Sequence, residues 1–564
     1  MSLSSSWLQP RPRPCVGSVR SPPEPPPTTM LGTCATPPDD LMHDLCIRDA
    51  LIVDGTGAPG VRGDVAVDGS TIVATGRVED GAAREIDAGG RVLAPGFIDV
   101  HTHSDLLLLD RPDHQPKVRQ GITTELTGLD GIGYAPLAAE NRQPFLDYFD
   151  ALNGQPDVDG RWETVGGWLD SFDRKVAVNV AHHLPHGCVR AAVLGWEDRP
   201  ATPEELAQMR QIAHEAMSDG AAAVSTGLDY APCTFSNTDE LVAISEPAGC
   251  FNAPFVTHMR YKLGMRQAIR ETLEIGRRAR CPVHISHFNS QDNSWWVNHD
   301  EADRGIDLGV SVSFDTYAWA AGSTLMHYSF PDWALDGGVP AMLARLDDPA
   351  IRARVEAEMR SADSGRQLDG SSVRLASVPS PTNRHLEGRI LADIAAERGV
   401  ASETLLVDLV IAERGVAAAV IHNSATDADF EMAMRHPGHM CSTDALLTGG
   451  SPHPRTFGTY PRFLGRFVRD RGALSLEEMI RHMASAPARR FGLIDRGLIQ
   501  PGMAADLVLI DMPRVNSNAT FDDPTNYPDG IDMVIVNGVV VVDHGRHTGA
   551  TPGRGLRRGI PAAA

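Results

Sequence analysis

Residues 95–103 read Pro-Gly-Phe-Ile-Asp-Val-His-Thr-His, an apolar strand that ends in two histidines one residue apart. Side chains along a strand alternate between its two faces, so His101 and His103 point to the same side and present two imidazoles to one ion. Neutral imidazole is the commonest nitrogen ligand of zinc. The same pattern also fits two solvated histidines at a strand end, so the motif alone leaves both interpretations open.

The composition favours a globular enzyme and argues against two classes of partner. With 564 residues, of which 42% are hydrophobic and 22% charged, the chain is long enough for one large catalytic domain with smaller attachments. It has no run of about 18 apolar residues, so we expect no membrane partner. Its formal net charge of -22 argues against nucleic acid, because phosphate recognition requires a basic surface.

The cysteines and the amino-terminal segment indicate the cellular compartment in which the protein is expected. Eight cysteines are scattered without a Cys-x-x-Cys pair, which favours free thiols in a reducing cytoplasm over a disulfide framework. Residues 1–43 contain proline-rich runs but no apolar core of signal-peptide length, so we expect a disordered extension there, with Met30 or Met42 as alternative translation starts. These features predict a cytoplasmic location.

Both ends of the remaining chain read as short strands. Residues 44–95 contain apolar runs separated by Asp-Gly and Gly turns, and similar runs return within 491–550, at 505–511 and 533–543. Because no helix separates these strands, we predict one small β-sandwich built from the two ends of the chain. A tail follows at 551–564.

Residues 96–490 alternate strand-like and helical runs, which is typical of a parallel α/β fold. Helical spacing occurs at 203–218, 264–279 and 475–486. The strand-like runs fit a (β/α)8 TIM-like barrel with one strand left over. They lie at 97–103, 123–129, 175–181, 221–226, 255–259, 282–287, 309–316, 418–422 and 439–444.

Three further candidate ligands each close an apolar strand. His258 ends Ala-Pro-Phe-Val-Thr-His, His287 ends Pro-Val-His-Ile-Ser-His, and Asp444 ends Met-Cys-Ser-Thr-Asp. In a barrel of this kind the reactive groups collect at the carboxyl ends of the strands. Any one of them could be structural, but four histidines and an aspartate at strand ends form a mixed nitrogen and oxygen donor set suited to zinc.

The residues at 96–103 resemble the first-strand motif of the metal-dependent amidohydrolase superfamily. Later motifs resemble one branch of it, the N-acyl-D-amino-acid deacylases or D-aminoacylases, and keep that family's order over residues 44–545. The resemblance implies the barrel described above, with an insertion near 325–415 that covers the active site. The matching motifs are Gln-Gly-Ile-Thr-Thr (120–124), Ser-Thr-Gly-Leu-Asp-Tyr (225–230), Thr-His-Met-Arg (257–260), Ile-Ser-His (285–287), Ala-Gly-Ser-Thr (321–324) and His-Pro-Arg-Thr-Phe-Gly-Thr-Tyr-Pro-Arg (453–462).

One ligand position departs from the family pattern. D-aminoacylases carry a cysteine in Gly-Asn-Cys-Gly after the second strand, where this chain reads Gly-Leu-Asp-Gly (128–131). A carboxylate can bind zinc and bridge two ions about 3.5–4 Å apart, so Asp130 can replace the thiolate. As a harder donor it would shift the preference towards manganese, iron or cobalt. The competing interpretation is that Asp130 caps the turn before Gly131.

The resemblance also assigns roles to individual residues. It implies that one or two divalent ions, zinc first, are held by His101, His103, Asp130, His258, His287 and Asp444. A bound ion polarises the amide carbonyl and lowers the pKa of water towards about 7. Asp444 then takes the proton of the water and returns it to the leaving amine. Arg455, Tyr317 and Ser323 match the residues that hold the carboxylate of the substrate.

The sequence therefore predicts a metal-dependent hydrolase of N-acyl-D-amino acids or similar small carboxylated amides. The D configuration of the substrate is implied by the resemblance alone. A cyclic-amide hydrolase or a lyase on the same barrel remains open, because Asp130 replaces the family cysteine and Asn289 stands where relatives carry a lysine. A non-catalytic metal-binding scaffold is the third interpretation, and the presence of Asp444 argues against it. The expected partner is a small molecule, and the oligomeric state is not predicted.

Overall fold

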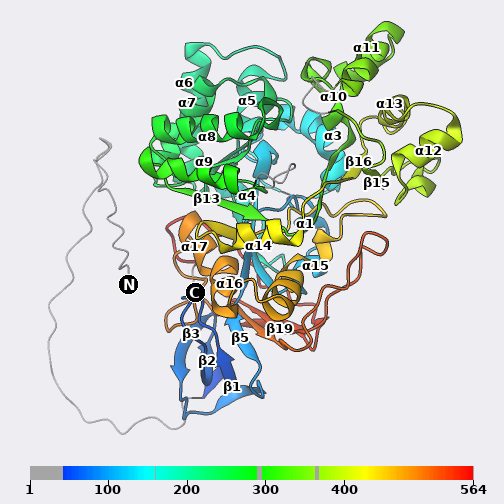
Figure 1. Ribbon diagram of the computed structural model, residues 1–564. Helices are drawn as coiled ribbons and strands as arrows, with labels where there is room; N and C mark the ends of the chain where they lie inside the picture. Colours follow the sequence, from blue (N-terminus) through cyan, green and yellow to red (C-terminus); the bar gives the residue numbers. More distant parts are fainter. Residues whose placement is uncertain (1–41, 159, 289–294, 362–366, 563–564) are drawn as a thin grey trace. The chain divides into compact units, whose positions relative to one another are not determined.

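The computed structural model describes residues 42–158, 160–288, 295–361 and 367–562 (Figure 1). The extension predicted at 1–43 lies almost entirely outside these residues, and Asn289 lies outside them as well. The polypeptide has a mixed α/β fold, in which an amino-terminal and a carboxyl-terminal group of strands flank a long region of alternating strands and helices. No helix in these ranges is both long and apolar enough to cross a bilayer.

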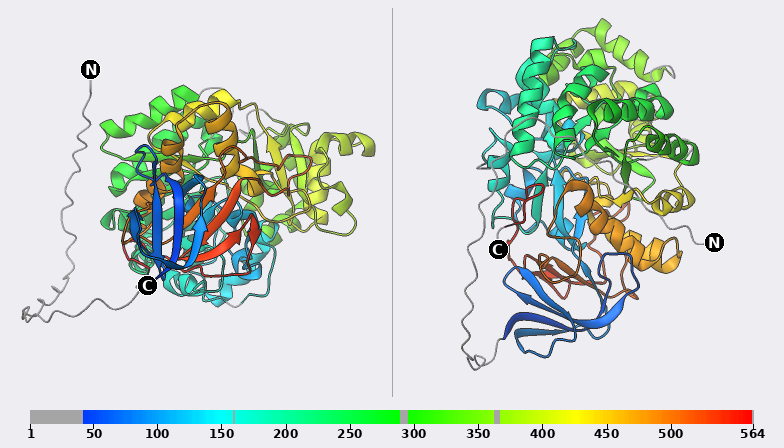
Figure 2. Two further views of the ribbon diagram at one scale, coloured as in Figure 1. Left: turned by 90° about the horizontal axis from the view of Figure 1, so that it is seen from below. Right: turned by 90° about the vertical axis from the view of Figure 1, so that its left-hand side faces the viewer.

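The two ends of the chain form one nine-stranded sheet, ordered β21-β20-β19-β18-β5-β1-β2-β3, with β4 paired to β1. The ends meet where β5 pairs antiparallel with β18, and Leu93 lies opposite Leu509. Figure 2 shows the blue amino-terminal strands beside the orange and red carboxyl-terminal ones. The strands are β1 (His43–Ile52), β2 (Val61–Asp68), β3 (Thr71–Gly76), β4 (Ala82–Asp87), β5 (Val92–Pro95), β18 (Leu507–Ile510), β19 (Ile531–Val536), β20 (Val539–Asp543) and β21 (Arg546–His547).

The central region contains two parallel sheets, ordered β6-β7-β8 and β9-β10-β11-β12-β13-β17. Nearly every residue of these strands is buried, as expected for parallel strands covered on both faces. The strands are β6 (Phe97–Asp99), β7 (Ile122–Thr127), β8 (Asn179–His182), β9 (Leu184–Pro185), β10 (Val224–Gly227), β11 (Phe255–His258), β12 (Val283–Ile285), β13 (Val312–Thr316) and β17 (His439–Cys441).

Helices follow most of the parallel strands, and α6 has the bounds that the sequence predicts, Pro203–Ser218. Thr202 and Glu205 form a capping box at its start, which satisfies two backbone N–H groups. The helix predicted at 475–486 is interrupted at Ala484, which has non-helical dihedral angles. The helices of this region are α1 (Leu107–Asp110), α2 (Gln115–Val118), α3 (Arg142–Asn153), α4 (Val165–Asp170), α5 (His186–Leu194), α6, α7 (Thr238–Cys250), α8 (Met265–Ala279), α9 (Trp295–Asp307), α14 (Asp427–Arg435), α15 (Arg455–Arg462), α16 (Leu476–Met483) and α17 (Ser485–Phe491).

A separate antiparallel sheet, β14-β16-β15, accounts for the strand left over in the sequence count. The predicted strand 418–422 is β16, which pairs with β14 and β15 rather than with a parallel neighbour. An apolar run alone does not reveal the direction of its partner, so the sequence could not make this distinction. The elements are β14 (Ala321–Leu325), α10 (Gly338–Leu346), α11 (Pro349–Arg360), β15 (Val373–Ser377), α12 (Leu391–Arg398), α13 (Ser402–Ala412) and β16 (Ala418–His422).

The end of the chain packs against the central region. Gly553 and Leu556 donate backbone hydrogen bonds to Val176 and Val180, at 2.8 Å in both cases. Leu556 is 4% exposed and joins a buried apolar cluster. The part of the predicted tail that the structure describes is therefore attached to the fold.

Candidate metal centre

The six predicted metal ligands lie close together, and each follows or ends a parallel strand. In parallel α/β folds the carboxyl ends of neighbouring strands meet at one edge of the sheet, which is where ligands bind. The positions are His101 and His103 after β6, Asp130 in the 3-10 turn Leu129–Gly131 after β7, His258 as the last residue of β11, His287 after β12, and Asp444 after β17.

One oxygen of Asp130 faces all four histidines. Its Oδ2 atom lies 3.4 Å from His101 Nε2 and 3.6 Å from His103 Nε2. It also lies 3.5 Å from His287 Nε2 and 3.8 Å from His258 Nδ1. A single carboxylate oxygen at the centre of four imidazoles is in the position that a bridging ligand requires.

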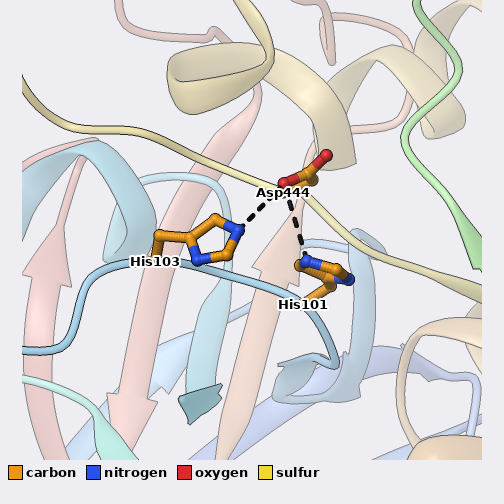
Figure 3. Close-up of side chains that lie close together, drawn as sticks. All are labelled: His101, His103 and Asp444. Carbon is orange, nitrogen blue, oxygen red and sulfur yellow. Dashed lines mark ion pairs between the residues drawn. The ribbon is translucent and has the colours of Figure 1, made fainter. Parts of the chain in front are cut away.

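Asp444 also faces the first histidine pair (Figure 3). Its Oδ1 atom lies 3.6 Å from His101 Nε2 and 3.4 Å from His103 Nε2. His101 Nε2 therefore faces two carboxylates, those of Asp130 and Asp444. Figure 3 shows the imidazoles of His101 and His103 turned towards Asp444.

These separations fit a divalent ion better than direct hydrogen bonds. Two ligands that each lie about 2.0–2.1 Å from one ion at the tetrahedral angle are about 3.3–3.4 Å apart, whereas N–H···O bonds are usually near 2.9 Å. His101 Nε2 and Asp130 Oδ1 are buried and have no hydrogen-bond partner among the described residues. Among the described residues, two sets could hold an ion: His101, His103 and Asp444, and His101, Asp130 and His287. The donor atoms lie within 4.8 Å of one another in each set.

The electrostatics of the cluster favour a cation. Burial raises the pKa of Asp130, yet the charges of His101 and His287 outweigh it and hold that pKa well below its usual value. Burial likewise lowers the pKa of His101, but Asp130 and Asp444 raise it well above its usual value. Buried carboxylates that depend on positive neighbours in this way are suited to a divalent ion.

Two further aspartates orient the imidazoles. Asp229 Oδ2 lies 3.2 Å from His258 Nε2, which turns the Nδ1 atom of that ring towards the cluster. Asp315 Oδ1 accepts a 3.0 Å hydrogen bond from the backbone N–H of His287, and its Oδ2 lies 3.7 Å from His101 Nδ1. Carboxylates behind ligand histidines fix the ring orientation and raise ligand basicity.

Three of the candidate ligands have left-handed backbone conformations. The φ angles are 53° at Asp130, 33° at His287 and 47° at Asp444. Non-glycine residues in this region cost of the order of 1–3 kcal/mol, and such residues gather at active sites. Holding these side chains at the strand ends therefore lowers the stability of the fold.

Asp130 does not act as a turn cap. No backbone N–H within the described ranges donates to its side chain, and Oδ1 is unpaired there. Its Oδ2 atom faces the imidazoles instead. This geometry favours the ligand interpretation over the turn-capping interpretation.

A small pocket lies beside the cluster. Its wall combines the polar groups of the cluster with apolar side chains. The lining residues are His103, Asp130, Ile132, Leu152, Tyr230, His287, Ser323, Thr324, Asp444 and Leu446.

The predicted substrate-binding residues lie around Asp444. Arg455 is fully buried, and its Nη1 atom lies 2.9 Å from Asp444 Oδ2. Its guanidinium stacks 4.4 Å above the ring of Tyr317, and Nη2 donates to the backbone oxygen of Ser323 at 3.3 Å. Nη1 thus faces the carboxylate of Asp444, whereas Nε of Arg455 has no hydrogen-bond acceptor among the described residues. The guanidinium therefore retains a donor for a second carboxylate.

The sequence interpretation missed the residues that support the cluster. Asp229 stands inside Ser-Thr-Gly-Leu-Asp-Tyr, and Asp315 stands inside the strand β13, which reads Val-Ser-Phe-Asp-Thr. Both are buried, at 1% and 0% exposure. An aspartate inside a predicted parallel strand, such as Asp315, is a usable signal, because unpaired carboxylates are almost never buried.

Comparisons with known proteins agree with this geometry. Residues 84–542 match the amidohydrolase family. A D-aminoacylase of Alcaligenes xylosoxydans xylosoxydans is 35% identical over 526 residues, which cover 92% of this chain and 99% of that protein. The chain therefore belongs to the amidohydrolase family, and within it to the N-acyl-D-amino-acid deacylases.

Two solved structures extend the comparison. The N-acyl-D-glutamate deacylase of Bordetella bronchiseptica, complexed with zinc and a phosphonate that mimics the tetrahedral intermediate, has a TM-score of 0.78 at 29% identity, covering 92% of this chain and 100% of that chain. A D-aminoacylase studied for the role of its binuclear metal centre has a TM-score of 0.77 at 33% identity, with the same coverage.

Proposed function

We propose that this protein hydrolyses the amide bond of N-acyl-D-amino acids or of similar small amides that carry a carboxylate. The observation that carries the proposal is the position of Arg455, whose buried guanidinium lies 2.9 Å from Asp444 and whose Nε has no acceptor among the described residues, beside a candidate metal centre. Such a fork suits a carboxylate placed next to the reacting bond. The D configuration is supported by the relatives alone.

We propose that the cluster holds one or two divalent ions, with zinc first and manganese, iron or cobalt as alternatives. When bound, a divalent ion supplies Lewis-acid polarisation of the amide carbonyl and a more acidic water. The relatives with zinc and with a binuclear centre support this proposal. The proposed ligands are His101, His103, Asp130, His258, His287 and Asp444.

The proton steps are proposed for Asp444. Burial raises the pKa of Asp444, but the charges of Arg455 and His101 outweigh burial and keep that pKa below its usual value. Asp444 is therefore ionised, which is the form that a general base requires, although the lowered pKa also makes it a weaker base. Its proposed role is to accept a proton from the attacking water and to return it to the leaving amine. Arg455, with Tyr317 stacked beneath it and Ser323 at the pocket wall, is proposed to hold the substrate carboxylate.

We also propose a domain organisation. The two parallel sheets would close into one (β/α)8 barrel over residues 96–490, with the insertion near 325–415. The short gap at His183 between β8 and β9, and the parallel bridge between Thr102 and Ala445, support closure. Residues 44–95 and 491–550 would form the β-sandwich, and a buried apolar cluster shared by both segments supports it.

The proposed partner is a small molecule, with neither nucleic acid nor membrane. The net charge of -22 supports the first exclusion. A cytoplasmic location remains a proposal that rests on the scattered cysteines.

Metal removal provides the direct test of the proposed function. Purified protein should contain one or two divalent ions per chain, and chelation should abolish hydrolysis until zinc, manganese or cobalt is added. Elemental analysis and a hydrolysis screen over N-acyl-D-, N-acyl-L- and cyclic amides give the readouts. Full activity of metal-free protein would refute the metal mechanism, and hydrolysis of cyclic amides alone would favour the alternative enzyme class.

A second prediction concerns Asp130. Asp130→Ala should reduce metal retention, whereas Asp130→Cys should restore a zinc site, because a thiolate can fill the same position. Both variants place a less tolerant residue at a φ of 53°, so they are matched in backbone cost, which is about 1–2 kcal/mol. Metal stoichiometry and melting temperature are the measurements. Equal metal content in the two variants would contradict the ligand role.

A further inference from the structure

Lys117 is one of three lysines in a chain that otherwise uses arginine for its basic residues, and it is fully buried. It stands on the short helix α2 and does not line the pocket beside the cluster. Its ammonium group nevertheless lies among side chains from the two segments that carry His101, His103 and Asp444. The proposed reaction assigns no role to Lys117.

The ammonium group of Lys117 donates three hydrogen bonds to these segments. The acceptors are Asp99 Oδ2 at 2.6 Å, Thr102 Oγ1 at 2.9 Å and Thr443 Oγ1 at 2.7 Å. Glu125 Oε1 on β7 lies 3.0 Å from the same nitrogen. All of these side chains are fully buried. Because a lysine has three N–H donors, the three bonds use its full capacity.

These contacts connect directly to the backbone of the candidate ligands. Asp99 accepts the backbone N–H of His101 at 3.3 Å and that of Thr443 at 2.9 Å. The hydroxyl of Thr443 donates to Asp99 at 2.5 Å. Asp444, the next residue, donates its backbone N–H to the carbonyl oxygen of His101 at 2.8 Å. Lys117 thus ties the end of β6 to the loop after β17, immediately behind the cluster.

The geometry at this position suits a lysine better than an arginine. The acceptors converge on one compact nitrogen, whereas a guanidinium is planar and directs its donors outward as a fork. An arginine could not place three donors on Asp99, Thr102 and Thr443 at these distances without moving one of them. A buried ammonium group is also costly unless it is paired and fully hydrogen-bonded, so its retention requires such a network.

We propose that Lys117 is a positioning residue that fixes the spacing between the histidine pair on the β6 loop and Asp444 on the β17 loop. This inference rests on the proposed function for its kinetic consequence, but not for its effect on metal affinity. Residues behind metal ligands typically change metal affinity or activity by about 10- to 100-fold when they are replaced.

The sharpest test replaces a single hydroxyl. Thr443→Val keeps the shape of the side chain but removes the hydroxyl that accepts from Lys117 and donates to Asp99, whereas Thr443→Ser keeps both hydrogen bonds. We expect Thr443→Val to lose about 10- to 100-fold in zinc affinity, measured by competition with a chelator, and a similar factor in kcat with little change in KM. Thr443→Ser should restore both quantities to within about threefold.

Lys117→Arg tests the ammonium group itself, and Lys175→Arg, at an exposed lysine, is the matched control. Lys117→Arg should weaken zinc binding and lower kcat, while Lys175→Arg changes neither. If Lys117→Arg does not fold, Thr443→Val still tests the hydrogen-bond network of Lys117, Asp99 and Thr443. A lower melting temperature with unchanged zinc affinity and kcat would assign the network a purely structural role and overturn the proposal. If no amide is hydrolysed by the wild type, the proposed function fails, but the zinc-affinity comparison still tests Lys117.

Discussion

Asp444→Asn should lower kcat by about 10²-fold or more, because an amide cannot take a proton from water and return it to the leaving amine. Asparagine is the appropriate replacement at this position. It has nearly the same shape as aspartate and tolerates the left-handed conformation, which Asp444 adopts with a φ of 47°. The loss should therefore reflect the missing carboxylate rather than a distorted loop.

Metal content must be measured with the kinetics, since Asp444 also faces His101 and His103. The kcat is then expressed per metal-loaded site. Asp427→Asn is a suitable control, because Asp427 pairs with arginines on the surface and lies outside the proposed site. We expect that control to retain wild-type kcat. A kcat of Asp444→Asn within about threefold of wild type, at full metal loading, would exclude Asp444 as the proton shuttle.

The sequence predicted the elements of the fold where periodicity is strong. Helix α6 has the predicted bounds, and the parallel strands start within a few residues of their predicted positions, except that β8 begins four residues later. The sequence predicted one strand too many for the barrel but could not identify it as β16, because strand partners are set by tertiary packing. Helices α10–α13 lie where the sequence is only weakly patterned, and the insertion near 325–415 was predicted without them.

The six candidate ligands could be selected from sequence because each ends an apolar strand or follows one in a matching motif. The residues that support these ligands could not be selected in the same way. Lys117 and Thr443 are 326 residues apart in sequence, and nothing in the local pattern of either residue points to the other. Arg455 illustrates the same limit. The motif predicted its place near the substrate, but its 2.9 Å contact with Asp444 arises only when α15 packs behind the loop after β17.

Arg455→Met should have an effect as large as that of Asp444→Asn. The substitution removes the positive charge beside a buried carboxylate, and breaking a buried ion pair costs about 3–5 kcal/mol. If that cost falls on substrate binding and reaction, kcat/KM drops by about 10²- to 10⁴-fold. Part of the cost falls on folding, so the melting temperature of this variant should also decrease. Arg455→Lys retains the charge and separates the two contributions.

Arg455→Lys tests whether the guanidinium recognises the carboxylate of the substrate. A lysine offers a point charge in place of a two-pronged donor, so we expect KM to rise about tenfold or more, with a smaller change in kcat. The rise should shrink when the carboxylate of the substrate is esterified, because the ester has no charge for either side chain to bind. Equal losses on acid and ester would show that Arg455 acts only through Asp444, 2.9 Å away. That result would remove the main support for an N-acyl amino acid and favour a cyclic amide without a free carboxylate.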